Sequence, residues 1–279
     1  MNGIGLERAL LAGRRAGRTE LIFFLNAGDP TPGLGFELLR VLAGHGVAAV
    51  ELCVPFPRSL SDGESIRASH RRALANGATL TTALALAARA RMELGLAICL
   101  LADYGHTVAP LGLPRFLEAC RDAGAAATLV HALPPQHRRE YVERSQGLGL
   151  GRIMSFFVGS TAAVRQAAYR EGEGFLYVVS RFGRTGQKVR FDGTLIEQIA
   201  EIRAETKKPL AVGFGVKTAE DIRSLRRAGA DAVIIGSAAT AVVERYLATP
   251  GQIPTAFDAL VLGLRSACTP GADNARPGH

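Results

Sequence analysis

The chain has 279 residues, of which 48% are hydrophobic and 21% charged, a composition that excludes a disordered, collagen-like or coiled-coil protein. Its length suits one large domain or two small ones, since domains commonly have about 100–200 residues and α/β barrels run to about 250. The formal net charge of +8 is spread over many predicted helix faces without an aromatic-interleaved basic patch, which argues against nucleic acid and suits an anionic small molecule.

Short apolar runs alternate with longer amphipathic stretches along the chain, as expected when parallel strands are each followed by a helix. The predicted strands are Leu21–Ala27, Ala48–Val54, Ala97–Ala102, Ala127–His131, Arg152–Phe156, Phe175–Val179, Leu210–Gly213 and Ala232–Gly236. The predicted helices are Gly5–Ala16, Leu34–His45, Leu80–Leu94, Leu113–Ala123, Pro135–Ser145, Thr161–Arg170, Thr194–Glu205, Ala219–Ala228 and Ala239–Leu247.

Eight strand–helix units predict a (β/α)8 TIM barrel with an additional N-terminal helix rather than an open doubly wound sheet, because no G-x-G-x-x-G follows the first strand. We expect residues 1–268 to form this single barrel domain. The Pro- and Gly-containing segment 269–279 is expected to be a disordered tail.

Cysteine spacing and hydropathy bear on metal sites, disulfides and the cellular compartment. The four cysteines are scattered without a CxxC pair, so neither a metal site nor a disulfide framework is predicted. No uncharged apolar run approaches the roughly 20 residues that cross a bilayer, and the N-terminus lacks the apolar stretch of a signal peptide. We therefore expect a cytoplasmic protein without a membrane partner.

Two carboxylates are predicted at the barrel mouth, where the loops that follow the strands carry the chemistry of such folds. Glu51 lies in an otherwise apolar strand, and Asp62 follows in the next loop. A buried carboxyl must be paired or kept protonated, so bonding of Glu51 to wall hydroxyls is an alternative to a catalytic role. Together the two carboxylates form a candidate acid/base pair in different environments.

Glycines follow the seventh and eighth strands, the usual phosphate site of these barrels. Gly213 and Gly215 lie after the seventh strand, and Gly236 and Ser237 after the eighth, where a helix N-terminus offers free N–H groups. The segment 180–186 after the sixth strand is a lid candidate.

Histidines are predicted in two groups. His45, His70, His137 and His279 are expected on the surface, whereas His106 and His131 are expected to face the mouth, where either could contact substrate.

Over roughly residues 5–265 the sequence resembles the α subunit of tryptophan synthase. The resemblance rests on residues 26–30 (NAGDP), 51–56 (ELCVPF), 61–63 (SDG), Tyr177 with residues 180–181 and 185–186, residues 212–215 (VGFG) and residues 235–237 (IGS). It implies an enzyme that cleaves indole-3-glycerol phosphate into indole and glyceraldehyde 3-phosphate by a retro-aldol reaction, without metal or organic cofactor.

The resemblance also implies roles for residues. Glu51 would protonate C3 of the indole and deprotonate the neighbouring hydroxyl, and Asp62 would bind the indole N–H. Tyr177 matches an active-site tyrosine, with core packing as the alternative role. Phe24, Leu100 and Leu129 are candidate walls for the indole, or simply core. Five residues would hold the phosphate: Gly186, Gly213, Gly215, Gly236 and Ser237.

This chain departs from the family pattern mainly where the family meets its β subunit. The departures are residues 57–59 (PRS), Glu64, residues 104–107 (YGHT) and Ala132, with Arg184 and Lys217 as extra cations at the mouth. They favour a stand-alone lyase that serves a specialised pathway and has only a doubtful β-subunit partner.

Three alternatives stay open. The chain could be a conventional α subunit that channels indole to an altered β subunit. It could act on a different indole or sugar phosphate, with Arg58, Arg184 or Lys217 binding an extra anionic group. It could also be an inactive scaffold, against which intact Glu51 and Asp62 argue.

Overall fold

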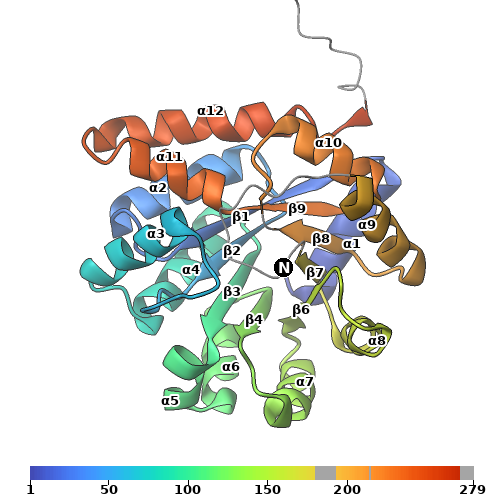
Figure 1. Cartoon of the computed structure of the whole chain (residues 1–279). Helices are drawn as coiled ribbons and strands as arrows, with labels where there is room; N and C mark the ends of the chain where they lie inside the picture. The colour runs from blue at the N-terminus through green and yellow to red at the C-terminus, as the bar shows by residue number, and fades with distance from the viewer. Residues whose placement is uncertain (180–192, 214, 271–279) are drawn as a thin grey trace, which may run out of the picture.

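The computed structural model describes residues 1–179, 193–213 and 215–270, and its parallel strands form one nearly closed barrel (Figure 1). The strands are β1 Glu20–Asn26, β2 Ala49–Cys53, β3 Ile98–Asp103, β4 Ala127–His131, β5 Gly151–Arg152, β6 Met154–Phe157, β7 Leu176–Val179, β8 Leu210–Gly213 and β9 Ala232–Ile235. They pair in the order β5-β4-β3-β2-β1-β9-β8-β7-β6. The predicted (β/α)8 barrel with an additional N-terminal helix is confirmed.

The predicted fifth strand is two short strands, β5 and β6, separated by Ile153. β5 pairs with β4 and β6 pairs with β7, so this stretch closes the barrel. Arg152 of β5 pairs with Thr128 of β4, and its N–H and C=O also exchange hydrogen bonds of 2.9 and 2.8 Å with Glu173 in an isolated antiparallel bridge.

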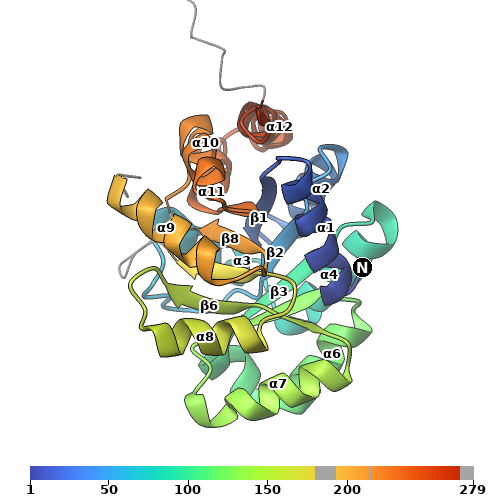
Figure 2. The same cartoon turned by 90° about the vertical axis from the view of Figure 1, so that its right-hand side faces the viewer.

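Helices surround the strands (Figures 1 and 2). They are α1 Gly3–Arg15, α2 Pro32–Gly44, α3 Glu64–Ala75, α4 Leu80–Leu94, α5 Ala109–Leu111, α6 Leu113–Asp122, α7 Arg138–Gly147, α8 Ala162–Glu171, α9 Gly193–Glu205, α10 Ala219–Arg227, α11 Ser237–Arg245 and α12 Ile253–Arg265, with short η1 Tyr104–Val108, η2 Pro135–His137 and η3 Pro250–Gln252. None of the described helices is long and apolar enough to span a membrane.

Helices α3 and α12 were not among the sequence predictions. In α3 the buried positions are mostly small or polar, including Ala68, Ser69 and His70, so no apolar stripe marks the helix. In α12 the buried residues Ile253, Phe257, Val261 and Leu264 do follow a helical spacing. The Phe257 ring packs against the Phe23 ring at 5.6 Å, which fixes α12 behind β1.

Alternation along the strands separates two apolar layers. Side chains such as Leu52 and Leu100 belong to the layer between strands and helices, whereas Ile22, Phe24 and Cys99 belong to the layer inside the barrel. Leu6 and Leu10 of α1 are fully buried in the inner layer. Helix α1 therefore closes one end of the barrel and leaves the other end as the mouth (Figure 2).

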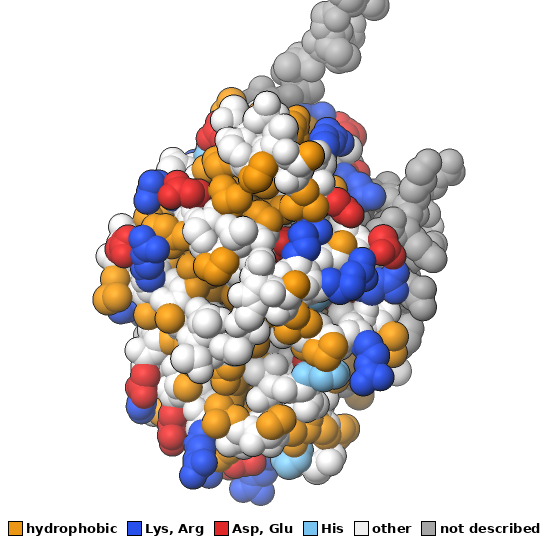
Figure 3. Space-filling view, turned by 90° about the vertical axis from the view of Figure 1, so that its left-hand side faces the viewer, with side chains coloured by type: hydrophobic (Ala, Val, Ile, Leu, Met, Phe, Trp, Pro, Cys, Tyr) orange, Lys and Arg blue, Asp and Glu red, His pale blue; other side chains and the backbone are white. Residues whose placement is uncertain are grey.

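Exposed basic side chains commonly lie beside acidic ones. Three helix-surface ion pairs are Arg89–Glu93 at 2.8 Å, Arg139–Glu143 at 2.7 Å and Arg144–Glu140 at 2.8 Å. On the face shown in Figure 3, basic side chains are interspersed with acidic and apolar ones. The sequence prediction that the charge does not mark a nucleic-acid surface stays a prediction.

Candidate active site

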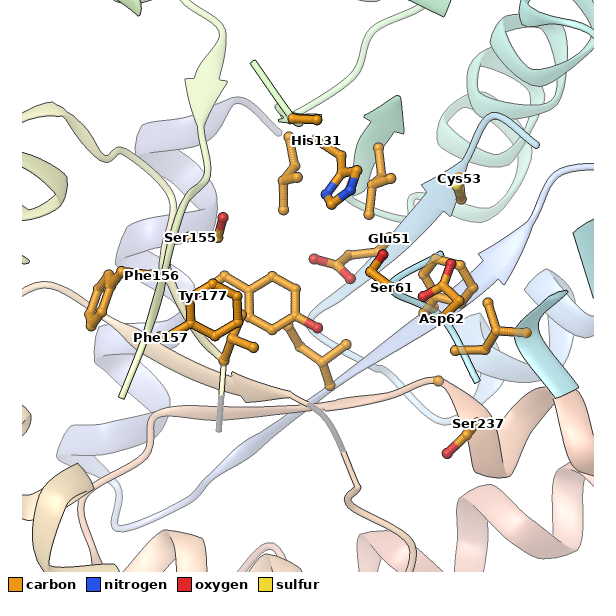
Figure 4. A pocket seen from close by; sticks show the side chains of 18 of the residues that line it. Glu51, Cys53, Ser61, Asp62, His131, Ser155, Phe156, Phe157, Tyr177 and Ser237 are labelled. Carbon is orange, nitrogen blue, oxygen red and sulfur yellow. The ribbon is translucent and has the colours of Figure 1, made fainter. Parts of the chain in front are cut away.

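A cavity of about 710 Å³ opens at the mouth of the barrel and is lined by residues of most strands and of the loops that follow them. Its volume is in the range of small-molecule sites. Figure 4 shows Glu51, Asp62 and Tyr177 around this cavity. The structure thus brings the three predicted catalytic side chains into one site.

Glu51 points into the cavity from the centre of β2, where every residue is buried. It is 1% exposed, and its Oε1 has no hydrogen-bond partner among the described residues. Burial raises the pKa of Glu51 from 4.5 to about 8, because an ionised carboxylate loses its hydration there. Glu51 is therefore mostly protonated at pH 7 and can act as a general acid.

Asp62 lies in the loop between β2 and α3 and is held from two sides. The Ser59 hydroxyl donates a short hydrogen bond to Asp62 Oδ2, and Nε2 of His70 lies 3.3 Å from the same oxygen. This His70 nitrogen forms no hydrogen bond with the described residues. These contacts leave the other carboxylate oxygen for a ligand in the cavity.

The prediction that His70 lies on the surface is wrong. His70 is 3% exposed, and its Nδ1 accepts a 3.2 Å hydrogen bond from the Phe56 N–H. Because a backbone donor occupies Nδ1, the proton of the neutral ring is on Nε2, which faces Asp62. The edge of the ring also packs on the Phe56 ring, with centroids 4.7 Å apart.

Tyr177 projects from β7 into the inner apolar layer and lines the cavity. Burial, followed by the carboxylates of Glu51 and Asp62, raises the pKa of its hydroxyl well above the ordinary value. The hydroxyl therefore stays protonated near neutral pH and is able to donate a hydrogen bond.

The predicted indole walls are partly right in position. Phe24 and Leu129 line the cavity, but Leu100 does not. Leu100 is fully buried in the layer between strands and helices, and its neighbour Leu101 lines the cavity instead. Successive residues of a strand face opposite sides of the sheet, so Leu101 faces the cavity while Leu100 faces the helices.

The predicted phosphate residues divide into three groups. Gly215, Gly236 and Ser237 line the cavity, and Gly215 has a φ of +88°, which favours glycine. Gly213 instead gives space to Tyr177, because a Cβ there would overlap the tyrosine ring and hydroxyl. Gly186 and the lid candidate with Arg184 lie outside the described residues.

The N-terminus of α11 also faces the cavity. Gly236 is its N-cap and supplies no side chain, so the first N–H groups of the helix are not capped by a side chain. Such a terminus offers donors and partial positive charge to an anion.

Several lining residues were not selected from the sequence, among them Ser61, Ser155 and Phe157. Ser155 carries a signal that could have selected it, because it is a polar residue inside an apolar strand, as Glu51 is. His131 lines the cavity as predicted, and His106 stacks on Phe56 with ring centroids 5.6 Å apart. No group of three or more described His, Cys, Asp or Glu side chains is arranged to hold a metal ion.

Comparisons with known proteins agree with the resemblance. The family described as "Tryptophan synthase alpha chain" matches residues 11–267. The tryptophan synthase alpha chain of Laribacter hongkongensis is 33% identical over 262 residues, covering 94% of this chain and 98% of that relative. That of Aromatoleum aromaticum is 34% identical over 239 residues, 86% of each chain.

Solved structures give the same picture. A mutant tryptophan synthase alpha-subunit from the hyperthermophile Pyrococcus furiosus is 28% identical, with a TM-score of 0.78, and covers 88% of this chain and 98% of its own. A protein from Aquifex aeolicus VF5 is 22% identical with a TM-score of 0.83, a likeness of fold.

Proposed function

Because the chain belongs to the tryptophan synthase alpha-chain family, we propose that it cleaves indole-3-glycerol phosphate to indole and glyceraldehyde 3-phosphate. The observation that carries the proposal is the buried, protonated Glu51 in a cavity that also holds Asp62 and an uncapped helix N-terminus. Three parts of the substrate need these three features: the carbon to be protonated, the ring N–H and the phosphate.

In the first step Glu51 transfers its proton to C3 of the indole, which breaks the ring's aromaticity and leaves positive charge on N1. The Asp62 carboxylate accepts a hydrogen bond from this N–H and stabilises the charge as it develops. In the second step the Glu51 carboxylate takes the proton of the hydroxyl on the carbon attached to C3. The C–C bond then breaks, its electron pair returns to the ring, and the carbon that bore the hydroxyl becomes an aldehyde. The protonated Glu51 is regenerated, so the proton balance closes.

The phosphate would lie against Gly215, Gly236 and Ser237, where the N-terminus of α11 meets the cavity. Gly186 and Gly213 complete the proposed phosphate set, and Gly213 also leaves space for the Tyr177 ring. Phe24, Leu129 and Leu101 would form apolar walls for the indole. Tyr177 would act as a neutral hydrogen-bond donor beside Glu51. No cofactor is required by this reaction.

We propose further that the chain works as a stand-alone cytoplasmic lyase. Support comes from the loops that depart from the family pattern at the partner-facing side. Arg58 and Ala132, both in such loops, have φ values of 57° and 54°, a region that non-glycine residues seldom adopt. Loops reshaped in this way would no longer match a β subunit of the usual kind.

The test is steady-state release of indole from indole-3-glycerol phosphate by the purified chain, alone and with added tryptophan synthase β subunit. Fast turnover that the β subunit leaves unchanged supports the stand-alone lyase. Slow turnover rescued by the β subunit, or co-purification with one, restores the channelling subunit. Glu51→Gln should abolish release, whereas Glu143→Gln, on the exposed face of α7, should not. No release in either condition contradicts the proposed reaction.

A further inference from the structure

Two polar side chains interrupt the apolar inner wall of the cavity. His131 is at the end of β4 and Ser155 is in β6, and both line the cavity and are exposed to it. Neither forms a hydrogen bond with any residue in the described parts of the chain, and Figure 4 shows both directed into the cavity. Apolar side chains of the neighbouring strands line the same wall, with Leu101 of β3 and Leu129 of β4.

The strand order places these two residues opposite the proposed binding groups for the indole N–H and the phosphate. Asp62 follows β2 and Ser237 follows β9, and β2 and β9 both pair with β1. β4 and β6 belong to the far side of the barrel, where the short strands β5 and β6 close the sheet. Figure 4 shows the same separation, with Asp62 and Ser237 across the cavity from Ser155.

The shape of the substrate then determines which part of the indole lies next to His131 and Ser155. Its N–H and the carbon that bears the glycerol phosphate both belong to the five-membered ring. When these are bound by Asp62 and the α11 N-terminus, the edge of the six-membered ring points away from both, toward β4 and β6. Figure 4 shows Glu51 between the two sides of the cavity, and in this orientation C3 of the substrate would face its carboxyl group.

A plain indole offers only C–H groups to this wall. It would displace water from His131 and Ser155 without replacing the lost hydrogen bonds, and leaving these polar groups unpaired disfavours its binding. A hydroxyl or amino group on the six-membered ring would restore them, because a neutral imidazole and a serine hydroxyl can each donate or accept.

We propose that His131 and Ser155 are specificity-determining residues that bind a hydroxyl or amino substituent on the six-membered ring of the indole. This inference rests on the proposed function, since it uses the substrate orientation that the reaction requires. It identifies the substrate class as ring-hydroxylated or ring-aminated indole-3-glycerol phosphates.

The experiment is a binding titration with free indoles. The chain has no tryptophan, so the fluorescence of the indole can be followed without a protein indole signal. The probes are indole and the sets of hydroxy-, amino- and methylindoles substituted at positions 4 to 7, where the methylindoles control for size. The proteins are the wild type, the double variant His131→Phe with Ser155→Ala, and Ser61→Ala as a cavity-lining serine outside the β4–β6 wall.

We expect the wild type to bind at least one hydroxy- or aminoindole about tenfold or more tightly than the methylindole substituted at the same position, a ratio equivalent to 1.4 kcal/mol. The double variant should lose this preference, and Ser61→Ala should keep it. Equal wild-type binding of polar and methyl probes at every position overturns the proposal, as does a preference that survives the double variant.

Turnover separates this proposal from the proposed function. Indole-3-glycerol phosphates with and without the best polar substituent are supplied to the same proteins. Cleavage of both with equal kcat/KM overturns the specificity role and leaves the reaction intact. Cleavage of neither overturns the proposed reaction. A higher kcat/KM for the substituted substrate that disappears in the double variant supports both.

Discussion

The burial of Glu51 should make the barrel less stable as its carboxyl ionises, and removal of the charge should reverse this. Burial raises the pKa of Glu51 from 4.5 to about 8, so between these two pH values the native state binds a proton that the unfolded state has lost. Native stability contributed by the protonated carboxyl is complete below about pH 4.5 and is lost as the pH rises through 8. At about 1.4 kcal/mol for each pH unit, the full effect is roughly 5 kcal/mol.

The perturbation that tests this is Glu51→Gln, which keeps the shape of the protonated side chain and cannot ionise. Its gain in free energy of unfolding over the wild type should be about 3 kcal/mol larger at pH 8.5 than at pH 5.5. Urea unfolding followed by far-ultraviolet circular dichroism measures both values. Glu143→Gln, an exposed carboxylate on α7, is the control and should show no such pH dependence. A gain that is equal at the two pH values, or a less stable variant at pH 8.5, would refute the reasoning.

Three further predictions concern turnover. The kcat/KM for indole-3-glycerol phosphate should fall as the pH rises through about 8, because the acidic form of Glu51 is lost there; a profile flat to pH 9.5 contradicts its role as the acid. Gly213→Ala should lower kcat at least about tenfold, because the new Cβ would displace Tyr177. The control Gly33→Ala should not lower kcat, because there is open space around Gly33. Equal activity of the two variants would show that Gly213 does not affect the active site. His70→Asn should lower kcat, because the shorter side chain keeps the contact with the Phe56 N–H but loses the N–H that faces Asp62. His70→Gln keeps an N–H toward Asp62 and should retain more activity than His70→Asn. Higher activity of His70→Asn than of His70→Gln, or a further loss when His70→Asn is added to Asp62→Asn, would show that His70 does not act through Asp62.

Much of the architecture was predictable from the sequence, since parallel strands buried on both faces read as short apolar runs. Glu51 could be selected for the same reason, as a charged residue in such a run. Helix α3 could not be predicted from the sequence, because its buried face consists largely of small and polar residues without a helical hydrophobic period. His70 was misplaced with it, and only the fold reveals that its two ring nitrogens lie between Phe56 and Asp62.

The direction of a strand side chain was the finest detail that the sequence left open. Leu100 and Leu101 are equally apolar neighbours, so composition does not say which one faces the cavity. The register of β3 with β2 decides it, since Glu51 pairs with Cys99 and Cys53 pairs with Leu101. Cys99, Leu101 and Glu51 therefore share the inner side of the barrel, and Leu100 lies on the outer side.

The two carboxylates of the site are suited to different tasks by what surrounds them. Glu51 is in the wall, where burial keeps it protonated and its Oε1 has no partner among the described residues, so it can give up a proton and take one back. Asp62 is in a loop, where the Ser59 hydroxyl donates a hydrogen bond to its Oδ2 and His70 Nε2 lies 3.3 Å from the same oxygen, so the carboxylate is held in one orientation. If the two carboxyl groups had the same surroundings, they would have similar acidity. The difference between wall and loop supplies both a mobile proton and a fixed negative charge, and the retro-aldol cleavage needs both.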